Sequence, residues 1–340
     1  MLTEIEQFSA LHGTLEVDTI FFGGGTPSTY PDDLLLDMAG TLNKVLVFAP
    51  QAEVTIEVNP GTVRASQLEL WKGVGINRLS IGVQSIKDTV LRSLNRHQSA
   101  AQVLELLASA STLFDNISVD LIIGLPGVDS DEWKSLLEQL VQWPIKHVSI
   151  YFLTVHEDTQ LYFRVQKNQI TLPSDEQVVP LYEWSVAFLA QHGFEQYELS
   201  NFARSGYYSR HNSTYWNRVP YKGFGIGACS FDGHRRFANE KNILKYMAAL
   251  EQGMSVGVFS ETLTPQQHRL EHIMLALRRP KGIEYDVLIQ GLTQAQRVTL
   301  DRTIDVLKQE GYLSIDGQRV CLTIKGLTVH HEMVIKLSIA

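Results

Sequence analysis

The sequence predicts an α/β fold of parallel βαβ units, followed by a small C-terminal domain of mixed α and β structure. In the first half, short runs rich in Val, Ile and Phe alternate with amphipathic stretches of helical period. Strands that alternate with helices in this way pair in parallel. After Ser260 the pattern changes to helical segments followed by a hairpin. The βαβ repeat is compatible with a doubly wound open sheet and with a partial barrel.

Five apolar runs are the expected strands of the first half, and they cover 19–23, 54–58, 78–83, 118–124 and 147–153. Two of the connecting helices are expected over 32–47 and 100–114. The segment that follows is less regular, is rich in aromatic residues and contains the string Gly223-Phe-Gly-Ile-Gly227. The expected domains are therefore a barrel or sheet domain, an irregular extension and a C-terminal domain, over 1–160, 161–260 and 261–340.

The C-terminal domain begins with an amphipathic helix over 265–277. Thr293 and Gln296 have the spacing of a capping box at the start of a second helix. The segments 312–315 and 318–324 flank an Asp-Gly turn, which is typical of a hairpin. Two helices followed by a hairpin predict a winged-helix-like domain.

Winged helices raise the question of DNA binding, and the charge of this domain argues against it. The second helix carries acidic residues among its basic ones, so it offers no basic reading face. The basic residues are Arg297, Arg302 and Lys308, and the acidic ones are Asp301, Asp305 and Glu310. The whole chain has a formal net charge of −8. We expect no nucleic-acid partner and a docking role for this domain.

Composition and terminal signals indicate a cytoplasmic protein. No run of 18 apolar residues occurs, so no transmembrane helix is expected, while peripheral membrane association stays open. The segment from Met1 to Glu6 has acidic residues and no basic one, unlike a secretory signal. Cys229 and Cys321 are the only cysteines and lie far apart in sequence, which argues against a disulfide framework.

The clearest signal for ligand binding is the string Phe21-Phe-Gly-Gly-Gly-Thr-Pro27 at the end of an expected strand. Ligand sites of parallel α/β folds lie at the carboxyl ends of the strands. Three glycines leave peptide groups open to the amino and carboxylate groups of an amino-acid-like ligand. A tight βα turn is the alternative explanation, and the string lacks the Gly-Lys-Ser/Thr ending of a phosphate loop.

Four further polar residues lie in or after other expected strands, namely Glu57, Gln84, Arg96 and Asp120. A carboxylate inside an apolar strand is costly to bury unless it has a partner. A single residue of this kind is usually a satisfied structural group. Several in successive strands of one sheet indicate a shared polar pocket.

The ordered strings GGGTPS, EVNPGT, NRLSIGVQS, LNRHQ and DLIIGLPG resemble those of the oxygen-independent coproporphyrinogen III oxidase-like family of radical-SAM proteins. Three later strings, YELSNFA, RHNSTYW and GFGIGACSF, resemble the heme-chaperone branch of that family (HemW) more than its oxidase branch. The resemblance extends over most of the chain. It implies a partial (βα)6 TIM-like radical-SAM barrel, which holds S-adenosylmethionine across its strand ends.

Seven residues match the family's S-adenosylmethionine pocket by motif: Gly24, Gly25, Thr26, Glu57, Gln84, Arg96 and Asp120. The resemblance implies that the first three hold the methionine end of the cofactor. It also implies heme as a ligand and a heme-receiving protein as a partner. His211 is the best candidate for an axial heme ligand, and a structural, hydrogen-bonded histidine is the alternative. Cys229 stands where relatives often carry His, and we expect a small buried thiol there.

The chain departs from the family pattern at its start. Family members hold a [4Fe–4S] cluster on a CxxxCxxC loop after their first strand, and that loop is absent from this sequence. We therefore expect a barrel lacking its first strand, from a fragment or a shortened start, and no residue that ligates the cluster. Whether the chain is an enzyme stays open.

The expected function is that of a heme chaperone. The alternatives are an oxygen-independent coproporphyrinogen III oxidase of porphyrin biosynthesis and a cluster-less protein that binds S-adenosylmethionine or heme without catalysis.

Overall fold

The computed structural model describes residues 1–157 and 159–338. Its contacts divide the chain into two compact units. The first, which we call the barrel unit, comprises 19–35 and 53–208. The second, which we call the terminal unit, comprises 1–18, 36–52 and the chain from Ser209 onward. The boundaries expected from the sequence, at 160 and 260, remain a prediction.

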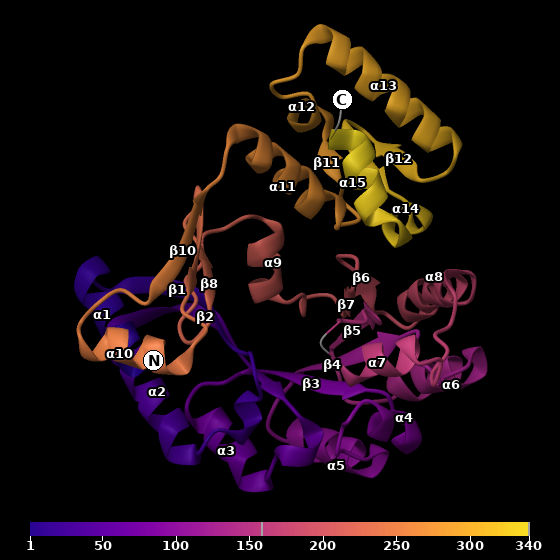
Figure 1. The fold of residues 1–340 in the computed structure, drawn as a ribbon. Helices are drawn as coiled ribbons and strands as arrows, with labels where there is room; N and C mark the ends of the chain where they lie inside the picture. The colour runs from indigo at the N-terminus through magenta and orange to yellow at the C-terminus, as the bar shows by residue number, and fades with distance from the viewer. Residues whose placement is uncertain (158, 339–340) are drawn as a thin grey trace. The chain divides into compact units, whose positions relative to one another are not determined.

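The barrel unit contains most of a curved sheet with the strand order β1-β2-β3-β4-β5-β7-β6, in which the first parts of β1 and β2 are assigned to the terminal unit. The strands from β2 to β5 pair in parallel, and β7 pairs antiparallel with β5. The strands are β1 (Leu15–Phe22), β2 (Leu46–Val58), β3 (Arg78–Gln84), β4 (Asn116–Ile123), β5 (His147–Phe152), β6 (Glu195–Gln196) and β7 (Asn201–Ala203). This curled, half-barrel parallel sheet confirms the predicted radical-SAM type of fold, and Figure 1 shows α3, α4 and α5 on its outer side.

Helices connect the strands of the half-barrel, as the βαβ pattern predicts. They are α2 (Asp32–Val45), α3 (Ala65–Gly73), α4 (Asp88–Ser93), α5 (Ala100–Ser111) and α6 (Ser130–Leu140), followed by α7 (Gln160–Gln166) and α8 (Asp175–Gln191). Short 3-10 turns, Pro27–Thr29 and Pro60–Thr62, follow β1 and β2. The helix expected over 32–47 ends at Val45, because β2 already begins at Leu46.

The alternation of side chains along β3 explains why one face of the sheet is polar. Leu79, Ile81 and Val83 are fully buried in the core. The residues between them, Ser80 and Gly82, therefore face the opposite, concave side. This alternation gives the half-barrel a hydrophobic outer layer under its helices and a polar inner face.

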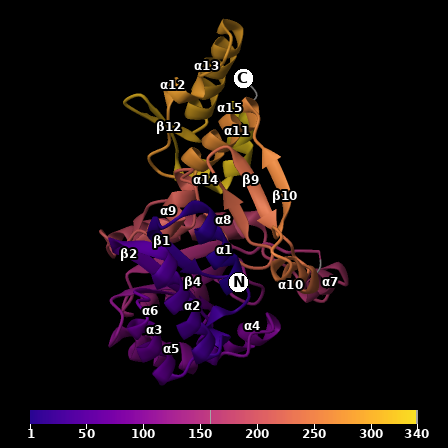
Figure 2. The ribbon, with the colours of Figure 1, turned by 90° about the vertical axis from the view of Figure 1, so that its left-hand side faces the viewer.

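The terminal unit contains a second sheet, with the order β10-β9-β8. Its strands are β8 (Cys229–Phe231), β9 (Arg235–Asn239) and β10 (Gly257–Thr262), and its helices are α1 (Leu2–His12), α9 (Arg210–Trp216) and α10 (Ile243–Glu251). Figure 2 shows β9 and β10 side by side as two extended strands. The expectation of a buried Cys229 is wrong: its side chain is exposed, because it begins the edge strand β8. Cys321 is buried.

The C-terminal part of this unit has the predicted order of helices and hairpin. Its elements are α11 (Pro265–Leu277), β11 (Ile283–Glu284), α12 (Tyr285–Leu288), α13 (Gln294–Gln309), β12 (Leu313–Asp316), β13 (Arg319–Leu322), α14 (Ile324–Thr328) and α15 (His330–Ser338). The capping box of Thr293 and Gln296 is present at the start of α13. Strands β12 and β13 form the expected antiparallel hairpin, and β11 pairs with β13.

A buried carboxylate anchors the N-terminal helix within the terminal unit. Glu4 is 5% exposed and accepts hydrogen bonds from Gly225 N at 2.8 Å, Asn239 Nδ2 at 2.7 Å and Tyr246 Oη at 2.6 Å. Lys222 Nζ forms an ion pair with it at 3.3 Å. Part of the Gly-rich string over 223–227 therefore serves to bring a backbone N–H to Glu4.

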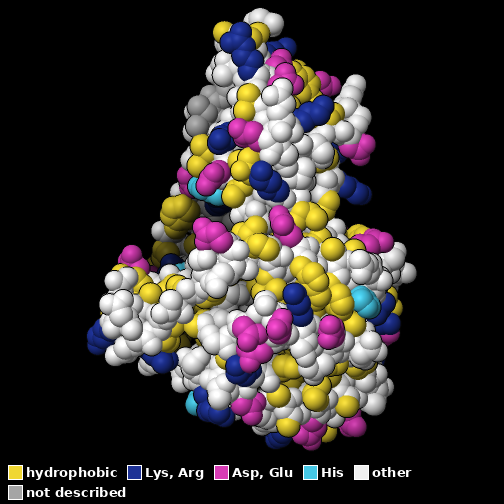
Figure 3. Space-filling model, turned by 90° about the vertical axis from the view of Figure 1, so that its right-hand side faces the viewer, with side chains coloured by type: hydrophobic (Ala, Val, Ile, Leu, Met, Phe, Trp, Pro, Cys, Tyr) yellow, Lys and Arg dark blue, Asp and Glu magenta, His cyan; other side chains and the backbone are white. Residues whose placement is uncertain are grey.

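The surface carries charges of both signs. On the face drawn in Figure 3, Lys and Arg side chains are interspersed with Asp and Glu side chains rather than gathered into one basic area. Among the described residues, no helix combines the length and hydrophobicity needed to cross a membrane.

Candidate functional site

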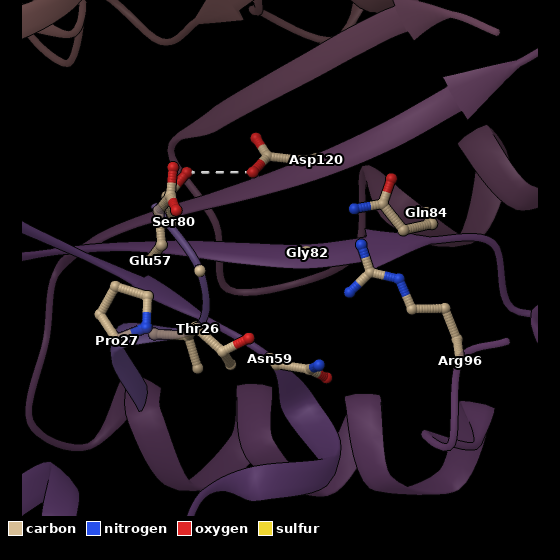
Figure 4. Close-up of a pocket in the computed structure, with 11 residues that line it drawn as sticks. Thr26, Pro27, Glu57, Asn59, Ser80, Gly82, Gln84, Arg96 and Asp120 are labelled. Carbon is tan, nitrogen blue, oxygen red and sulfur yellow. Dashed lines mark hydrogen bonds between the residues drawn. The ribbon is translucent and has the colours of Figure 1, made fainter. Parts of the chain in front are cut away.

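A polar pocket opens at the carboxyl ends of β2, β3 and β4, entirely within the barrel unit (Figure 4). Six of the seven residues predicted from the sequence line it: Gly25, Thr26, Glu57, Gln84, Arg96 and Asp120. The seventh, Gly24, lies beside it, and its N–H donates to Glu57 Oε2 at 3.2 Å. Pro27, Val58, Asn59, Ser80 and Gly82 complete the lining.

The glycine turn after β1 presents open backbone. Gly24 and Gly25 have φ of 78° and 64°, in the left-handed region that favours glycine. A Cβ at either position would meet no other atom within 4 Å, so the space beside both Cα atoms is open. Gly23 differs, because its Cβ would lie 2.5 Å from the Phe21 ring. The turn therefore needs Gly23 for packing and leaves Gly24 and Gly25 accessible to a ligand.

Ser28 joins this turn to the one that follows β2. Its hydroxyl is fully buried, lies 2.8 Å from Thr62 Oγ1 and accepts from Asn59 N at 3.1 Å. The GGGTPS and EVNPGT strings are thus held together by hydrogen bonds between their ends. This connection fixes Glu57 and Asn59 opposite the glycine turn.

The end of β3 is distorted where it enters the pocket. Gln84 has φ of 65°, which is rare for a residue with a long side chain. The pairing of β3 with β4 shifts register between Gly82 and Gln84, so the bulge re-aims the Gln84 amide. Gln98 Nε2 donates to Gly82 O and Val83 O, at 2.9 Å each, and holds this end of the strand. Backbone strain of this kind is common at ligand sites.

Two carboxylates, Glu57 and Asp120, lie on one side of the pocket. Burial raises the pKa of Glu57; the Gly24 N–H lowers it, and the nearby charge of Asp120 raises it again. Burial likewise raises the pKa of Asp120. Ser80 Oγ donates to Asp120 Oδ2 at 3.1 Å, the contact dashed in Figure 4. The Asp120 Oδ1 atom is buried and forms no hydrogen bond of its own with the residues that the structure describes.

The pocket has a negative and a positive end. Figure 4 shows Glu57 and Asp120 on one side and Gln84 with Arg96 on the other. Carboxylates bind ammonium groups and hydroxyls, whereas a guanidinium binds a carboxylate. The pocket is therefore suited to a ligand that carries an ammonium, hydroxyls and a carboxylate.

Comparisons with known proteins agree with this geometry. The model of the Radical SAM superfamily matches residues 3–140. Heme chaperone HemW of Bacillus subtilis (strain 168) is 31% identical over 324 residues, which cover 94% of this chain and 85% of that protein. Heme chaperone HemW of Synechocystis sp. is 33% identical over 310 residues, or 90% of this chain and 75% of that protein. The chain belongs to the HemW-like radical-SAM family.

Two further proteins are similar to this chain, one in sequence and one in fold. Radical S-adenosyl methionine domain-containing protein 1, mitochondrial, of Bos taurus is 32% identical over 350 residues, or 99% of this chain and 79% of that protein. The coproporphyrinogen III oxidase HemN of Escherichia coli, a radical SAM enzyme, superposes with a TM-score of 0.82 over 99% of this chain and 81% of its own. Its sequence is 22% identical, so this likeness shows the fold alone.

The family implies S-adenosylmethionine and a [4Fe–4S] cluster as cofactors. The described residues of this HemW-like chain suit the first of these better than the second. The open glycine turn and the buried, unpartnered Asp120 Oδ1 suit a ligand of the pocket. Within residues 1–157 and 159–338, no group of three His, Cys, Asp or Glu side chains is placed to hold a metal ion. Cys229 and Cys321 are both free thiols, and a cluster needs several thiolates together. The described residues thus fit the nucleoside cofactor and do not fit the cluster.

His211 lies outside the pocket. It is in α9 of the terminal unit, and its Nε2 is 2.8 Å from Tyr215 Oη. Sequence reasoning missed the pocket residues Ser80 and Asn59. Alternation along β3 could have indicated Ser80, because it lies on the same face as Gly82, whereas Asn59 gave no signal beyond its place in the EVNPGT string.

Proposed function

We propose that the pocket of the barrel unit binds S-adenosylmethionine and that the protein is a heme chaperone, which binds heme and passes it to another protein. The observation that carries the first part is the gathering of six motif residues around one pocket with opposite charges at its two ends. The names of the HemW relatives support the second part.

Different residues of the pocket would contact different chemical groups of S-adenosylmethionine, according to their charge. Gly24, Gly25 and Thr26 offer backbone groups to the methionine end, with Glu57 beside them for the ammonium. Arg96 and Gln84 offer donors to a carboxylate or to ring nitrogens. Asp120 has a free oxygen for a ribose hydroxyl. When bound in radical-SAM proteins, the cofactor supplies a radical; the residues of this chain position it and exclude water.

Calorimetric titration with S-adenosylmethionine tests the pocket. Replacing Arg96 by Met or Glu57 by Gln removes one charged contact, and we expect each to weaken binding about tenfold or more. The matched control is Arg64→Met, because Arg64 pairs with Asp32 on the surface of the same unit. Absence of binding to folded protein, or equal affinity in all variants, would reject the site.

Heme binding is proposed to use His211 as the axial ligand. Tyr215 already hydrogen-bonds to Nε2, so this role requires either Nδ1 or a displaced tyrosine. Titration of heme, followed in the visible absorption spectrum, should show about tenfold weaker binding for His211→Ala. His12→Ala, at an exposed histidine of α1, should bind as the unchanged protein does. An unchanged spectrum in His211→Ala would assign the ligand elsewhere.

Assays on the same protein preparation would distinguish two other functions from that of a heme chaperone. Decarboxylation of coproporphyrinogen III in the presence of S-adenosylmethionine and a reductant would favour the oxidase over the chaperone. Binding of S-adenosylmethionine with no heme affinity would favour a binding protein without a chaperone role.

Both cysteines are free thiols, which suits a reducing compartment such as the cytoplasm.

A further inference from the structure

Arg78 is a buried charge one layer below the pocket. It is the first residue of β3 and is 2% exposed. Two residues later on the same strand, Ser80 lines the pocket and donates to Asp120. Because side chains alternate along a strand, Arg78 lies on the same concave side of the sheet as Ser80. Its guanidinium therefore belongs to the interior of the half-barrel, toward the amino ends of the strands.

The residues beside Arg78 on the neighbouring strands are uncharged. Thr55 and Asn116 are its register partners on β2 and β4. One buried polar atom of each of the three residues forms no hydrogen bond with the described part of the chain, namely Thr55 Oγ1, Arg78 Nε and Asn116 Oδ1. None of the ion pairs found between described residues includes Arg78. A buried guanidinium without a salt bridge is unfavourable for folding, which points to a role other than stability.

The charge of Arg78 acts on the pocket. Burial raises the pKa of Asp120, while the Ser149 hydroxyl, the positive charge of Arg78 and the Ser80 hydroxyl lower it. The pKa of His147 is lowered by burial and then by Arg78, so this ring is neutral. Glu57 and Tyr151 interact electrostatically with Asp120, Glu198 interacts with Tyr151, and Arg96 lines the same pocket.

We infer that Arg78 is a positioning residue, which keeps the Asp120 carboxylate anionic from the layer below the pocket so that it can accept from a hydroxyl or cationic group of the ligand. A protonated carboxyl would itself need an acceptor and would lose one accepting oxygen. Arg96 lies at the opposite end of the pocket, so it does not replace Arg78 in this role. The inference rests on the proposed function only for the identity of the ligand.

The charge state of Asp120 can be measured without any ligand. Carbon-13 NMR of protein labelled at the aspartate carboxyl carbons follows each titration, and Asp120→Asn assigns the signal. Arg78→Met keeps the aliphatic stem and removes the charge, so it should raise the proton affinity of Asp120 about tenfold or more. Arg78→Lys keeps a charge and should stay near the unchanged protein, as should the surface control Arg64→Met.

If the titration midpoint of Asp120 is the same in Arg78→Met as in the unchanged protein, the inference is wrong. If that variant does not fold, Arg78→Gln, which retains hydrogen-bonding groups for Thr55 and Asn116, takes its place with the same expectation. Calorimetry with S-adenosylmethionine supplies a second readout: the charge-removing variant should bind more weakly at acidic pH and recover toward alkaline pH. A shifted midpoint without any binding rejects the proposed function alone, and binding with an unshifted midpoint rejects the role of Arg78 alone.

Discussion

Two carboxylates, the buried Glu4 of the terminal unit and the half-buried Asp120 of the barrel unit, differ in how many partners the chain gives them. Glu4 has three hydrogen-bond donors and an ion pair with Lys222. Asp120 accepts from Ser80 and has the Ser149 hydroxyl near its carboxyl, and its Oδ1 is buried with no hydrogen bond of ordinary geometry to the described residues. Buried polar groups are normally satisfied, and exceptions concentrate at functional sites. Glu4 is therefore a structural group, and the fewer partners of Asp120 support its proposed role as a ligand contact.

The largest expected effect follows from breaking the satisfied network. Replacing Glu4 by Ala leaves Lys222 and Asn239 without their partner and should destabilise the terminal unit by about 3 kcal/mol or more. Urea denaturation monitored by circular dichroism measures this change. Glu6→Ala, on the exposed side of the same helix, should change stability by less than about 0.5 kcal/mol.

Equal stability of the Glu4→Ala and Glu6→Ala proteins would show that the Glu4 network does not hold α1. The assignment of Glu4 as a structural group would then be wrong.

A smaller and opposite effect on stability is expected in the pocket. Asp120→Asn removes a half-buried carboxylate that has few partners, so the protein should be at least as stable as before at neutral pH. The same change should weaken S-adenosylmethionine binding about tenfold. Thermal unfolding and calorimetry on one preparation measure both quantities. A large loss of stability would make Asp120 a structural charge like Glu4.

The pH dependence of the protein's stability should also reflect the raised pKa values of the two pocket carboxyls, Glu57 and Asp120. Because burial raises the pKa of Glu57 and Asp120 in the folded protein, the folded state binds more protons than the unfolded state just above their ordinary pKa values. Their contribution to stability therefore falls as the pH rises through that window and is constant above it. Thermal melts from about pH 4 to pH 8 should show this fall in the unchanged protein and a weaker one in Asp120→Asn. Parallel curves would contradict the raised pKa.

The smallest expected effect is found by comparing two glycines that both have a positive φ but different surroundings. Gly13 and Gly25 have φ of 72° and 64°, and a Cβ on either would meet nothing within 4 Å. Alanine at either position should cost about 1 kcal/mol of stability or more, since both residues have a positive φ. Only Gly25→Ala should weaken S-adenosylmethionine binding, because Gly25 lines the pocket. Melting temperatures and calorimetry of the pair separate the two effects, and equal affinities would count against the turn as a ligand contact.

The sequence predicts the half-barrel and most of its pocket for identifiable reasons. Strands β3, β4 and β5 are apolar runs buried on one face, and Glu57 and Asp120 stand out within such runs because carboxylates are rare there. The β8–β10 sheet was missed because β10 is exposed along nearly all of its length and so lacks a period-two pattern.

Other features depend on contacts that a local pattern does not contain. The partners of Glu4 lie more than two hundred residues away in the sequence, as its bond to Gly225 spans 221 positions. Arg78 at the start of a strand would ordinarily be assigned to the surface, because arginine is seldom fully buried. Only the tertiary structure shows that one charge is fully paired and the other is not.

Hydrogen exchange with and without S-adenosylmethionine tests most directly whether the incompletely paired pocket of the barrel unit is the ligand site. The account predicts slower exchange, on adding the ligand, in peptides covering the glycine turn at 23–28 and the segment 80–98, with none at α1 or Glu4. Protection that is absent from both pocket segments, or confined to the terminal unit, would contradict it.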